Sequence, residues 1–218
     1  LGEENSPYKS VSCFAGEILY IDIDFLVRDG LLSEEDVKPF DFPKNVDFDA
    51  VSEFKMPLLR KAAANFDADS ASYRNFLNEN QFWIDDYALL MAAFDDFCVN
   101  SVIDLPEGIK YRLPDVLEGF KLTHKKETEF YKITQFLFYE QYFALKKYVN
   151  KNGIKIIGDI PIYVAMDSAD TWSRPDLFEL DEDCNPVNVA GCPPDAFSAD
   201  GQYWGNPIYN YEYFRTNN

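Results

Sequence analysis

The sequence predicts an α/β protein in which helices predominate and one strand belongs to a parallel sheet. Apolar residues recur at helical spacing between residues 49 and 97, and a second helical pattern extends from 127 to 150. The β-branched run Ile154–Ile157 follows this second pattern after a single turn. A helix that leads through a tight turn into such a run is typical of a parallel α/β sheet.

Helix signals are clear before and within the first helical region. Asp22 is predicted to cap a short helix that extends to Arg28 and is ended by Gly30. Ser33 and the acidic residues after it predict a capping box at the start of another turn. From Asp49 onward, a shared helix face is formed by Val51, Phe54, Leu58, Leu59 and Ala62. Similar spacing around Tyr73 and over 83–97 predicts a cluster of helices.

The pattern over 127–150 predicts one long helix with a buried stripe. The stripe comprises Phe130, Ile133, Leu137, Ala144 and Tyr148, which lie at three- and four-residue steps or their multiples. Gly153 stands where a left-handed C-terminal residue is expected. From Trp172 onward, prolines and glycines interrupt every pattern, so the rest of the chain is predicted to be structured loop.

The composition and net charge indicate which kinds of binding partner are disfavoured. The 218 residues are 47% hydrophobic and carry a formal charge of −18, which disfavours nucleic acid and anionic membranes as partners. A neutral sugar polymer is compatible with this charge, and acidity that only keeps the protein soluble explains it equally well. No apolar run is long enough to cross a bilayer.

The cysteines and the chain ends give further expectations. The four cysteines show no CxxC spacing, which indicates a reducing compartment, and the cytoplasm is the expected location. The sequence begins with Leu1 and ends at Asn218 without an evident terminal element. We therefore expect an internal piece of a longer protein.

Two places are candidates for chemistry on the residues alone. Asp159 lies just past the predicted strand, where carboxyl ends of barrel strands present side chains to an active site; a carboxylate that caps the following turn is the alternative. The loop 191–207 combines carboxylates, amides and aromatic rings on a backbone stiffened by prolines. Such loops bind sugars by ring stacking and bidentate hydrogen bonds, although a surface loop with tucked aromatics is equally compatible.

Several motifs are set aside. The stretch 181–186 begins like a calcium loop, but Pro186 occupies the sixth position and Cys192 the twelfth, so a solvated turn is expected. His124 is the only histidine, which excludes histidine-rich metal sites. The chain has no glycine-rich phosphate loop. Arg174-Pro175-Asp176 matches an Arg-x-Asp motif but lies outside any strand pattern, so we interpret it as coincidence.

Taken together, these segments resemble a known family. The run 158–165 with 167–170 and Trp172 resembles the third-strand motif of amylomaltases and disproportionating enzymes. The stretch from Val189 through Tyr209 resembles their lid loop, and residues 6–8 with Ser10 and 14–16 resemble the segment after their second strand. The residues between 82 and 92 resemble a helix of their inserted helical subdomain. The chain is thus similar to the 4-α-glucanotransferases of glycoside hydrolase family 77.

The resemblance implies a partial (β/α)8 TIM barrel of the α-amylase type, covering the third-strand region with an inserted helical subdomain. The expected parts are 1–125 (the segment after the second strand plus the subdomain), 126–170 (barrel helix and third strand) and 171–218 (active-site lid). The implied activity is transfer of α-1,4-glucan segments between maltooligosaccharides by a retaining double displacement, without a cofactor. Nucleic acid and membrane partners are not implied.

The resemblance also implies roles for particular residues. Asp159 would be a supporting active-site carboxylate, and Tyr8 would line the cleft near the cleaved bond. The remaining candidates for substrate contact are Ser6, Asp195, Phe197, Gln202 and Trp204. The family's nucleophile and acid/base have no counterpart in this chain, so the chain alone is expected to be inactive. An α-glucan hydrolase on the same scaffold and a non-catalytic glucan-binding module are the alternatives.

Overall fold

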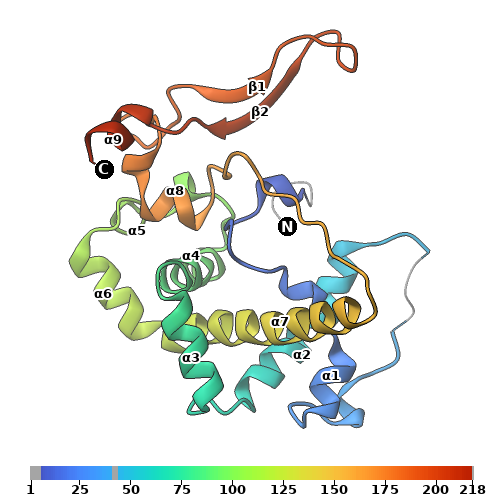
Figure 1. Ribbon diagram of the computed structural model, residues 1–218. Coiled ribbons are helices and arrows are strands. Elements are labelled where there is room, and N and C mark those ends of the chain that lie inside the picture. Colours follow the sequence, from blue (N-terminus) through green and yellow to red (C-terminus); the bar gives the residue numbers. More distant parts are fainter. Residues whose placement is uncertain (1–5, 41–43, 218) are drawn as a thin grey trace. The chain divides into compact units, whose positions relative to one another are not determined.

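The computed structural model describes residues 6–40 and 44–217 (Figure 1). Contacts divide these residues into two compact units, which we describe separately. Unit 1 comprises residues 6–15, 89–124 and 159–217, and unit 2 comprises 16–40, 44–88 and 125–158. The chain passes between the units after Ala15, within α4, after α6 and after Gly158. The predicted boundaries at 125 and 170 stay predictions.

Unit 2 is helical, as the spacing of its apolar residues predicts. Its elements are the 3₁₀ helix η3 (Ile18–Tyr20), α1 (Ile23–Arg28), η4 (Glu34–Asp36), α2 (Phe48–Ala64), α3 (Ala71–Asn80), the start of α4 (Ile84–Phe97) and α7 (Lys125–Lys151). The Asp22 carboxylate caps α1 by accepting from the Asp24 N–H, and Gly30 follows with a φ of +77°. The Ser33 N–H donates to Asp36 at 3.0 Å, which confirms the predicted capping box.

Aromatic rings from several helices form the core of unit 2 around Phe136 on α7. The rings of Phe66, Tyr73 and Phe76 lie 5.4, 5.5 and 5.6 Å from that of Phe136. The Tyr73 side chain is buried, and its hydroxyl donates to the Glu129 carboxylate at 2.7 Å. Large rings at such distances supply much of the apolar burial that holds a small helical unit together.

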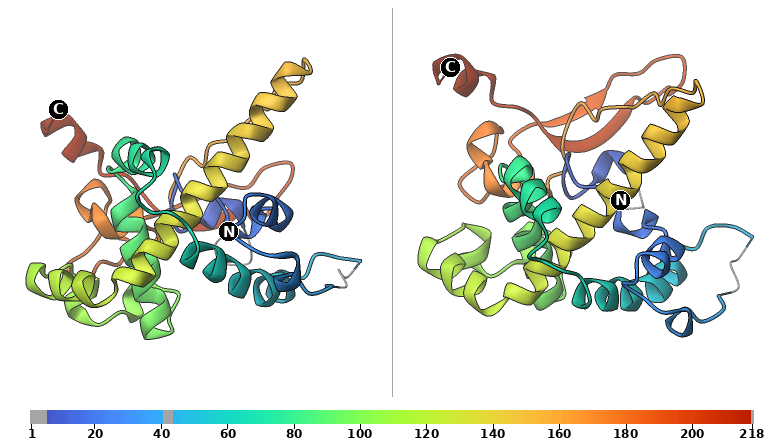
Figure 2. Two further views of the ribbon diagram at one scale, coloured as in Figure 1. Left: turned by 90° about the horizontal axis from the view of Figure 1, so that it is seen from below. Right: turned by 60° about the horizontal axis from the view of Figure 1, so that its bottom comes forward.

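The long helix α7 confirms one prediction and corrects another. It runs uninterrupted from Lys125 to Lys151 (Figure 2), and Gly153 follows with a φ of +76°. The predicted stripe is buried at Phe130, Ile133 and Leu137 but exposed at Ala144 and Tyr148. Its continuation was therefore predicted wrongly, because periodicity shows that a face is apolar but not how far other helices cover it.

Unit 1 is built from short elements. These are η2 (Pro7–Lys9), the end of α4, η5 (Val102–Asp104), α5 (Glu107–Lys110), α6 (Pro114–Thr123), α8 (Ala169–Ser173), η6 (Pro175–Leu177), β1 (Val189–Cys192), β2 (Gln202–Pro207) and α9 (Tyr211–Thr216). Strands β1 and β2 pair antiparallel with a bulge, as Figure 1 shows. Gly191 is required in β1, because a Cβ there would meet the Gln202 carbonyl oxygen at 2.6 Å.

The strands of the described residues lie elsewhere than the sequence predicts. Residues 154–160 have no regular secondary structure here, and Ile157 is 95% exposed. A parallel strand forms only beside a neighbour that completes its hydrogen-bond ladder, and the described part of the chain supplies none. The strands that do form lie in the region predicted as loop. There a bulge, two glycines (Gly191 and Gly205) and Pro207 hide the alternation of apolar and polar residues that indicates a strand.

Two features bear on membranes and metals. Within the described ranges, no helix has the length and apolarity needed to cross a bilayer. Over the same residues, no cluster of three or more histidine, cysteine, aspartate or glutamate side chains could hold a metal ion. The predicted solvated turn at 181–186 is confirmed, since Asp181 accepts from the N–H groups of Asp183 and Asn185.

Candidate functional site

Tyr8 and Asp159 meet in unit 1. Ser6 begins η2 by accepting a hydrogen bond from the Tyr8 N–H at 3.3 Å, and Pro7 occupies the first helical position. This turn leaves the Tyr8 ring 55% exposed, and its hydroxyl donates to Oδ2 of Asp159 at 2.7 Å. Two residues that lie 151 positions apart in the sequence thus form a polar pair at the surface.

The Tyr8–Asp159 hydrogen bond also sets the proton affinity of the phenol. Donation to Asp159, and then the negative charge of that carboxylate, raise the pKa of Tyr8 above its ordinary value. The pair therefore presents a protonated hydroxyl and a carboxylate side by side. While the phenol proton is donated to Asp159, the Tyr8 oxygen and the carboxylate oxygens can accept hydrogen bonds from the hydroxyl groups of a polar ligand.

Asp195 organises the exposed end of the loop 191–207. Its Oδ1 accepts from the N–H groups of Phe197 and Ser198, each at 2.8 Å. Donation by Ser198 first, and then by Phe197, lowers the pKa of the Asp195 carboxyl, because both bonds favour the ionised form. The turn leaves the Phe197 side chain 96% exposed. A large apolar ring held in solvent by a specific turn is available for contact with a ligand.

Gln202 and Trp204 lie on β2 and contact each other. The indole Nε1 of Trp204 donates to Oε1 of Gln202 at 2.9 Å, which holds the indole with 37% of its residue surface exposed. The buried Asn206 farther along β2 donates to the Val164 carbonyl at 2.9 Å. This bond fastens β2 to the segment that follows Asp159.

Tyr163 is a residue that the sequence reasoning did not single out as a site candidate. Its ring centre lies 6.5 Å from that of Trp204 and 5.9 Å from that of Tyr209, against which it stacks. Tyr209 in turn stacks on Phe178 at 5.3 Å. These four rings form a continuous row in unit 1. The available signal was the position of Tyr163 only four residues after Asp159.

The predicted site residues therefore come together in three groups. Tyr8 lies with Ser6 and Asp159, Asp195 lies with Phe197, and Gln202 lies with Trp204. In the described part of the chain, no hydrogen bond joins one group directly to another. Each group shows a side chain or a polar pair to solvent.

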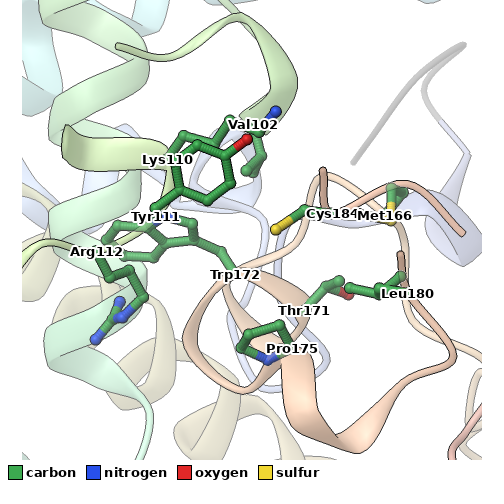
Figure 3. Close-up of a pocket in the computed structure, with 10 residues that line it drawn as sticks. All are labelled: Val102, Lys110, Tyr111, Arg112, Met166, Thr171, Trp172, Pro175, Leu180 and Cys184. Carbon is green, nitrogen blue, oxygen red and sulfur yellow. The ribbon is translucent and has the colours of Figure 1, made fainter. Parts of the chain in front are cut away.

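A cavity of about 100 Å³ lies elsewhere in unit 1 (Figure 3). Tyr111 and Trp172 line one side of it, and Met166, Leu180 and Cys184 line the other. The Arg112 guanidinium lies 4.2 Å from the centre of the Trp172 ring system. None of the seven predicted site residues lines this cavity, so it is separate from the candidate site.

The Arg174-Pro175-Asp176 motif lies in η6 and its N-cap and not in a strand. Arg174 Nε and a terminal nitrogen donate to the two Asp176 oxygens at 2.9 and 2.7 Å. This bidentate bond, made largely in solvent, lowers the pKa of Asp176 to about 2. A carboxylate engaged in this way within η6 is a structural partner of its neighbour.

Comparison with known proteins places these residues in context. The family model described as 4-alpha-glucanotransferase matches residues 1–218. A 4-alpha-glucanotransferase from Clostridium butyricum is 42% identical over 98% of this chain, and one from Aquifex aeolicus is 40% identical over 95%. The chain spans 45% and 42% of the length of these two relatives.

Solved structures agree with the sequence comparison. An amylomaltase from Streptococcus agalactiae, solved in complex with acarbose, superposes with a TM-score of 0.90 at 38% identity. The match covers 97% of this chain and 44% of that one. An amylomaltase from Corynebacterium glutamicum, at 21% identity and a TM-score of 0.63, shares the fold. With a family model matched along its whole length, the chain belongs to the 4-alpha-glucanotransferase family.

Proposed function

We propose that this chain is part of a 4-α-glucanotransferase that moves α-1,4-glucan segments between maltooligosaccharides. The observation that carries this proposal is the family match from residue 1 to residue 218. Because the chain spans less than half of its relatives, the activity belongs to the longer protein. We expect the nucleophile and the acid/base of a retaining mechanism outside this chain.

The part of this chain in the reaction is to bind and orient the glucan. Asp159 is the supporting carboxylate, and Tyr8 lies beside it near the bond to be cleaved. Their hydrogen bond of 2.7 Å supports this assignment, since it holds the phenol oxygen and the carboxylate together as hydrogen-bond acceptors at one point of the surface. A hydroxyl-rich substrate needs such paired groups for orientation.

The loop 191–207 supplies the remaining contacts. Asp195, Gln202 and Trp204 hydrogen bond to or stack on the glucan, and Phe197 and Ser6 contribute at its margins. The exposed ring of Phe197 and the Trp204–Tyr163 row support this assignment, because flat apolar faces stack on sugar rings. A loop that covers the site also excludes water, which favours transfer to a sugar over hydrolysis.

We further propose that residues 154–160 form the third strand of a (β/α)8 barrel in the longer protein, with α7 as the barrel helix before it and an inserted helical subdomain within the first 125 residues. The exposure of Ile157 and Ile160, at 95 and 85%, supports this, since apolar side chains on both faces of such a strand are normally buried in a parallel sheet. Hydrogen–deuterium exchange on the full-length protein tests it. Protected amides over 154–160 are expected, and fast exchange there would contradict the barrel.

The activity is tested with the full-length protein and maltotriose. A transferase produces glucose together with oligosaccharides longer than maltotriose, whereas a hydrolase produces only shorter sugars. The names of the relatives favour transfer. Exclusive formation of shorter sugars would replace the proposal with the hydrolase alternative. Acarbose binding without any turnover would favour a glucan-binding module.

Site variants test the residue assignments. Tyr8→Phe removes only the hydroxyl that reaches Asp159, and Trp204→Ala removes the exposed indole. Each is expected to lower kcat/KM by about tenfold or more, in line with the loss of a stacking or positioning contact. Tyr148→Phe serves as the matched control, since Tyr148 is similarly exposed at 68% but lies on α7. If Tyr148→Phe lowers kcat/KM as much as Tyr8→Phe does, Tyr8 has no specific role in the site.

A further inference from the structure

Helix α8 holds the segment that carries Tyr8 by three hydrogen bonds. The Ala169 N–H donates to the Val11 carbonyl at 2.8 Å. Oδ2 of Asp170 accepts from the Cys13 N–H, and Oδ1 accepts from the Cys13 thiol, both at 3.0 Å. One carboxylate thus binds the backbone and the side chain of the same residue, which fixes both the position and the orientation of Cys13.

The support for Asp170 is rigid. Ser168 is fully buried and caps α8 by accepting from the Thr171 N–H, while the Thr171 hydroxyl donates to the Ala165 carbonyl at 2.9 Å. The buried indole of Trp172 donates to the Ile109 carbonyl at 3.0 Å. Because the residues around Asp170 are packed and hydrogen bonded, its carboxylate has one fixed place in unit 1.

Hydrogen bonds within the segment also brace the backbone on both sides of Cys13. The Ser10 hydroxyl donates to the Ser12 carbonyl at 2.9 Å. The buried Ser12 side chain accepts from the N–H groups of Phe14 and Ala15 at 3.1 and 3.3 Å. Only four residues separate Cys13 from Tyr8, and the Ser10 bond and the Lys9 N–H bond to the Ser6 carbonyl restrain the backbone between them.

We propose that Asp170 is a positioning residue of the candidate site, which holds the segment 6–13 so that the Tyr8 hydroxyl stays within hydrogen-bonding reach of Asp159. This inference rests on the proposed function for its relevance to catalysis. Asp170 acts through Cys13 and the intervening backbone and does not itself contact the glucan. The geometry predicts that a change at Asp170 acts mainly through Tyr8.

The first test reads the anchor directly and is independent of activity. Partial burial of the Cys13 thiol, and then the Asp170 carboxylate beside it, raise the pKa of the thiol to about 12, although the residue as a whole remains exposed. Asp170→Asn in the full-length protein removes the negative charge and one acceptor. Iodoacetamide labelling of Cys13 at pH 8, followed by peptide mass spectrometry, is expected to become at least about tenfold faster.

Asp167→Asn is the matched control for this experiment. Asp167 lies three residues earlier and accepts from the Ser101 hydroxyl and the Val102 N–H, both at 2.7 Å. The Asp167→Asn variant therefore weakens comparable hydrogen bonds in the same unit without changing a contact of Cys13. The rate of Cys13 labelling is expected to stay at the wild-type value. Equal labelling rates in wild type and Asp170→Asn would overturn the anchor.

The second test reads the effect on Tyr8. Selective ¹³C labelling of tyrosine allows the Tyr8 phenol to be titrated by NMR. In Asp170→Asn, the pKa of Tyr8 is expected to fall toward its ordinary value, and in Asp167→Asn it is expected to stay raised. An unchanged Tyr8 titration in Asp170→Asn would show that Asp170 does not position the hydroxyl.

The third test connects the anchor to turnover by a double-mutant cycle on maltotriose disproportionation. Asp170→Asn is expected to lower kcat by about tenfold in the wild-type background. In the Tyr8→Phe background the loss is expected to be much smaller, since no hydroxyl remains to be positioned. Equal losses in both backgrounds would overturn the proposal.

Cys13→Ser is a conservative control. It keeps both hydrogen-bond donors and is expected to retain kcat within about twofold. If Asp170→Asn does not fold, Cys13→Ala removes the thiol donor alone and is expected to lower the Tyr8 pKa in the same direction. If wild type fails to disproportionate maltotriose, the proposed function is wrong, while the labelling and Tyr8 titrations still decide whether Asp170 positions Tyr8.

Discussion

The Gln135 side chain on α7 binds both backbone groups of Gly16. The Gly16 N–H donates to Oε1 at 2.8 Å, and Nε2 donates to the Gly16 carbonyl at 2.9 Å. Gln141, six residues later, repeats the arrangement with Asp22, which lies six residues after Gly16, at 2.7 and 3.1 Å. Two side-chain amides on one helix thus supply the hydrogen bonds that the backbone groups of Gly16 and Asp22 require.

The first prediction concerns the difference between these two glutamines. Gln135 is fully buried, whereas Gln141 is partly exposed. Gln135→Leu removes the partners of two partly buried backbone groups of Gly16, and a loss of about 3 kcal/mol in the free energy of unfolding is expected. Gln141→Leu is expected to cost about 1 kcal/mol, because water can replace its bonds. Urea denaturation of the full-length variants measures both, and equal losses would contradict the role of burial.

The second prediction concerns the absence of a side chain at Gly16. A Cβ at this position would lie 2.0 Å from the Phe138 ring. Gly16→Ala is therefore expected to destabilise the protein by about 1–3 kcal/mol through forced displacement of the ring. Gly119→Ala is the control, because a Cβ on this α6 residue meets nothing within 4 Å and a helical Gly→Ala change is neutral or stabilising.

Removal of the obstructing ring provides a second check on Gly16. In a Phe138→Ala background, Gly16→Ala is expected to cost much less than in the wild-type protein, because the ring is gone. Thermal unfolding of the four proteins in this cycle gives the coupling. Additive effects would indicate that Gly16 is required for a reason other than the approach of Phe138.

The third prediction is the pH dependence of the Tyr8–Asp159 bond. The folded-state pKa of Tyr8 is raised, so the bond is fully present below the ordinary tyrosine pKa and is lost as the pH rises through the raised value. Asp159→Asn removes the negative charge, and the pKa of Tyr8 is expected to fall. NMR titration of ¹³C-labelled tyrosine measures the change. An identical Tyr8 titration in wild type and Asp159→Asn would contradict the pair.

The fourth prediction is the acid dependence of the turn at Asp195. Its pKa is lowered, so its contribution is present above the ordinary aspartate pKa and is lost as the pH falls through the lowered value. The Phe197 and Ser198 amide resonances are expected to shift together in that acidic range. In Asp195→Asn, these shifts should disappear.

A second turn in the same chain serves as the control for Asp195. Asp181 accepts from the N–H groups of Asp183 and Asn185 in a similar way, and its pKa is also lowered. The Asp183 and Asn185 amides are expected to keep their acid-induced shifts in Asp195→Asn. Loss of both sets of shifts would mean that the change reports general unfolding at low pH.

Local features of the fold were predicted well. The cap at Asp22, the capping box at Ser33 and the left-handed residue at Gly153 all follow from short-range rules and are confirmed. The helices over 49–97 and 127–150 are confirmed for the same reason. Each depends on hydrogen bonds and spacing within a few residues, which the sequence contains in full.

Sheet pairing could not be predicted in the same way. Residues 154–157 have strand composition, yet a strand is formed only together with a neighbour, and none of the described residues pairs with them. Conversely, β1 and β2 form because Gly191 allows close approach to Gln202, a relation between residues eleven positions apart. Composition indicates a tendency to form strands, but pairing is decided by partners.

The candidate site shows the same division. The sequence by itself determined the family, since the order and spacing of motifs from Ser6 to Tyr209 are a property of the chain and need no coordinates. Only the tertiary structure decided that Tyr8 donates to Asp159, that Asp170 holds Cys13, and that Tyr163 continues the Trp204 row. These contacts join residues that lie 41 to 157 positions apart, and no local pattern records which distant side chains folding brings into contact.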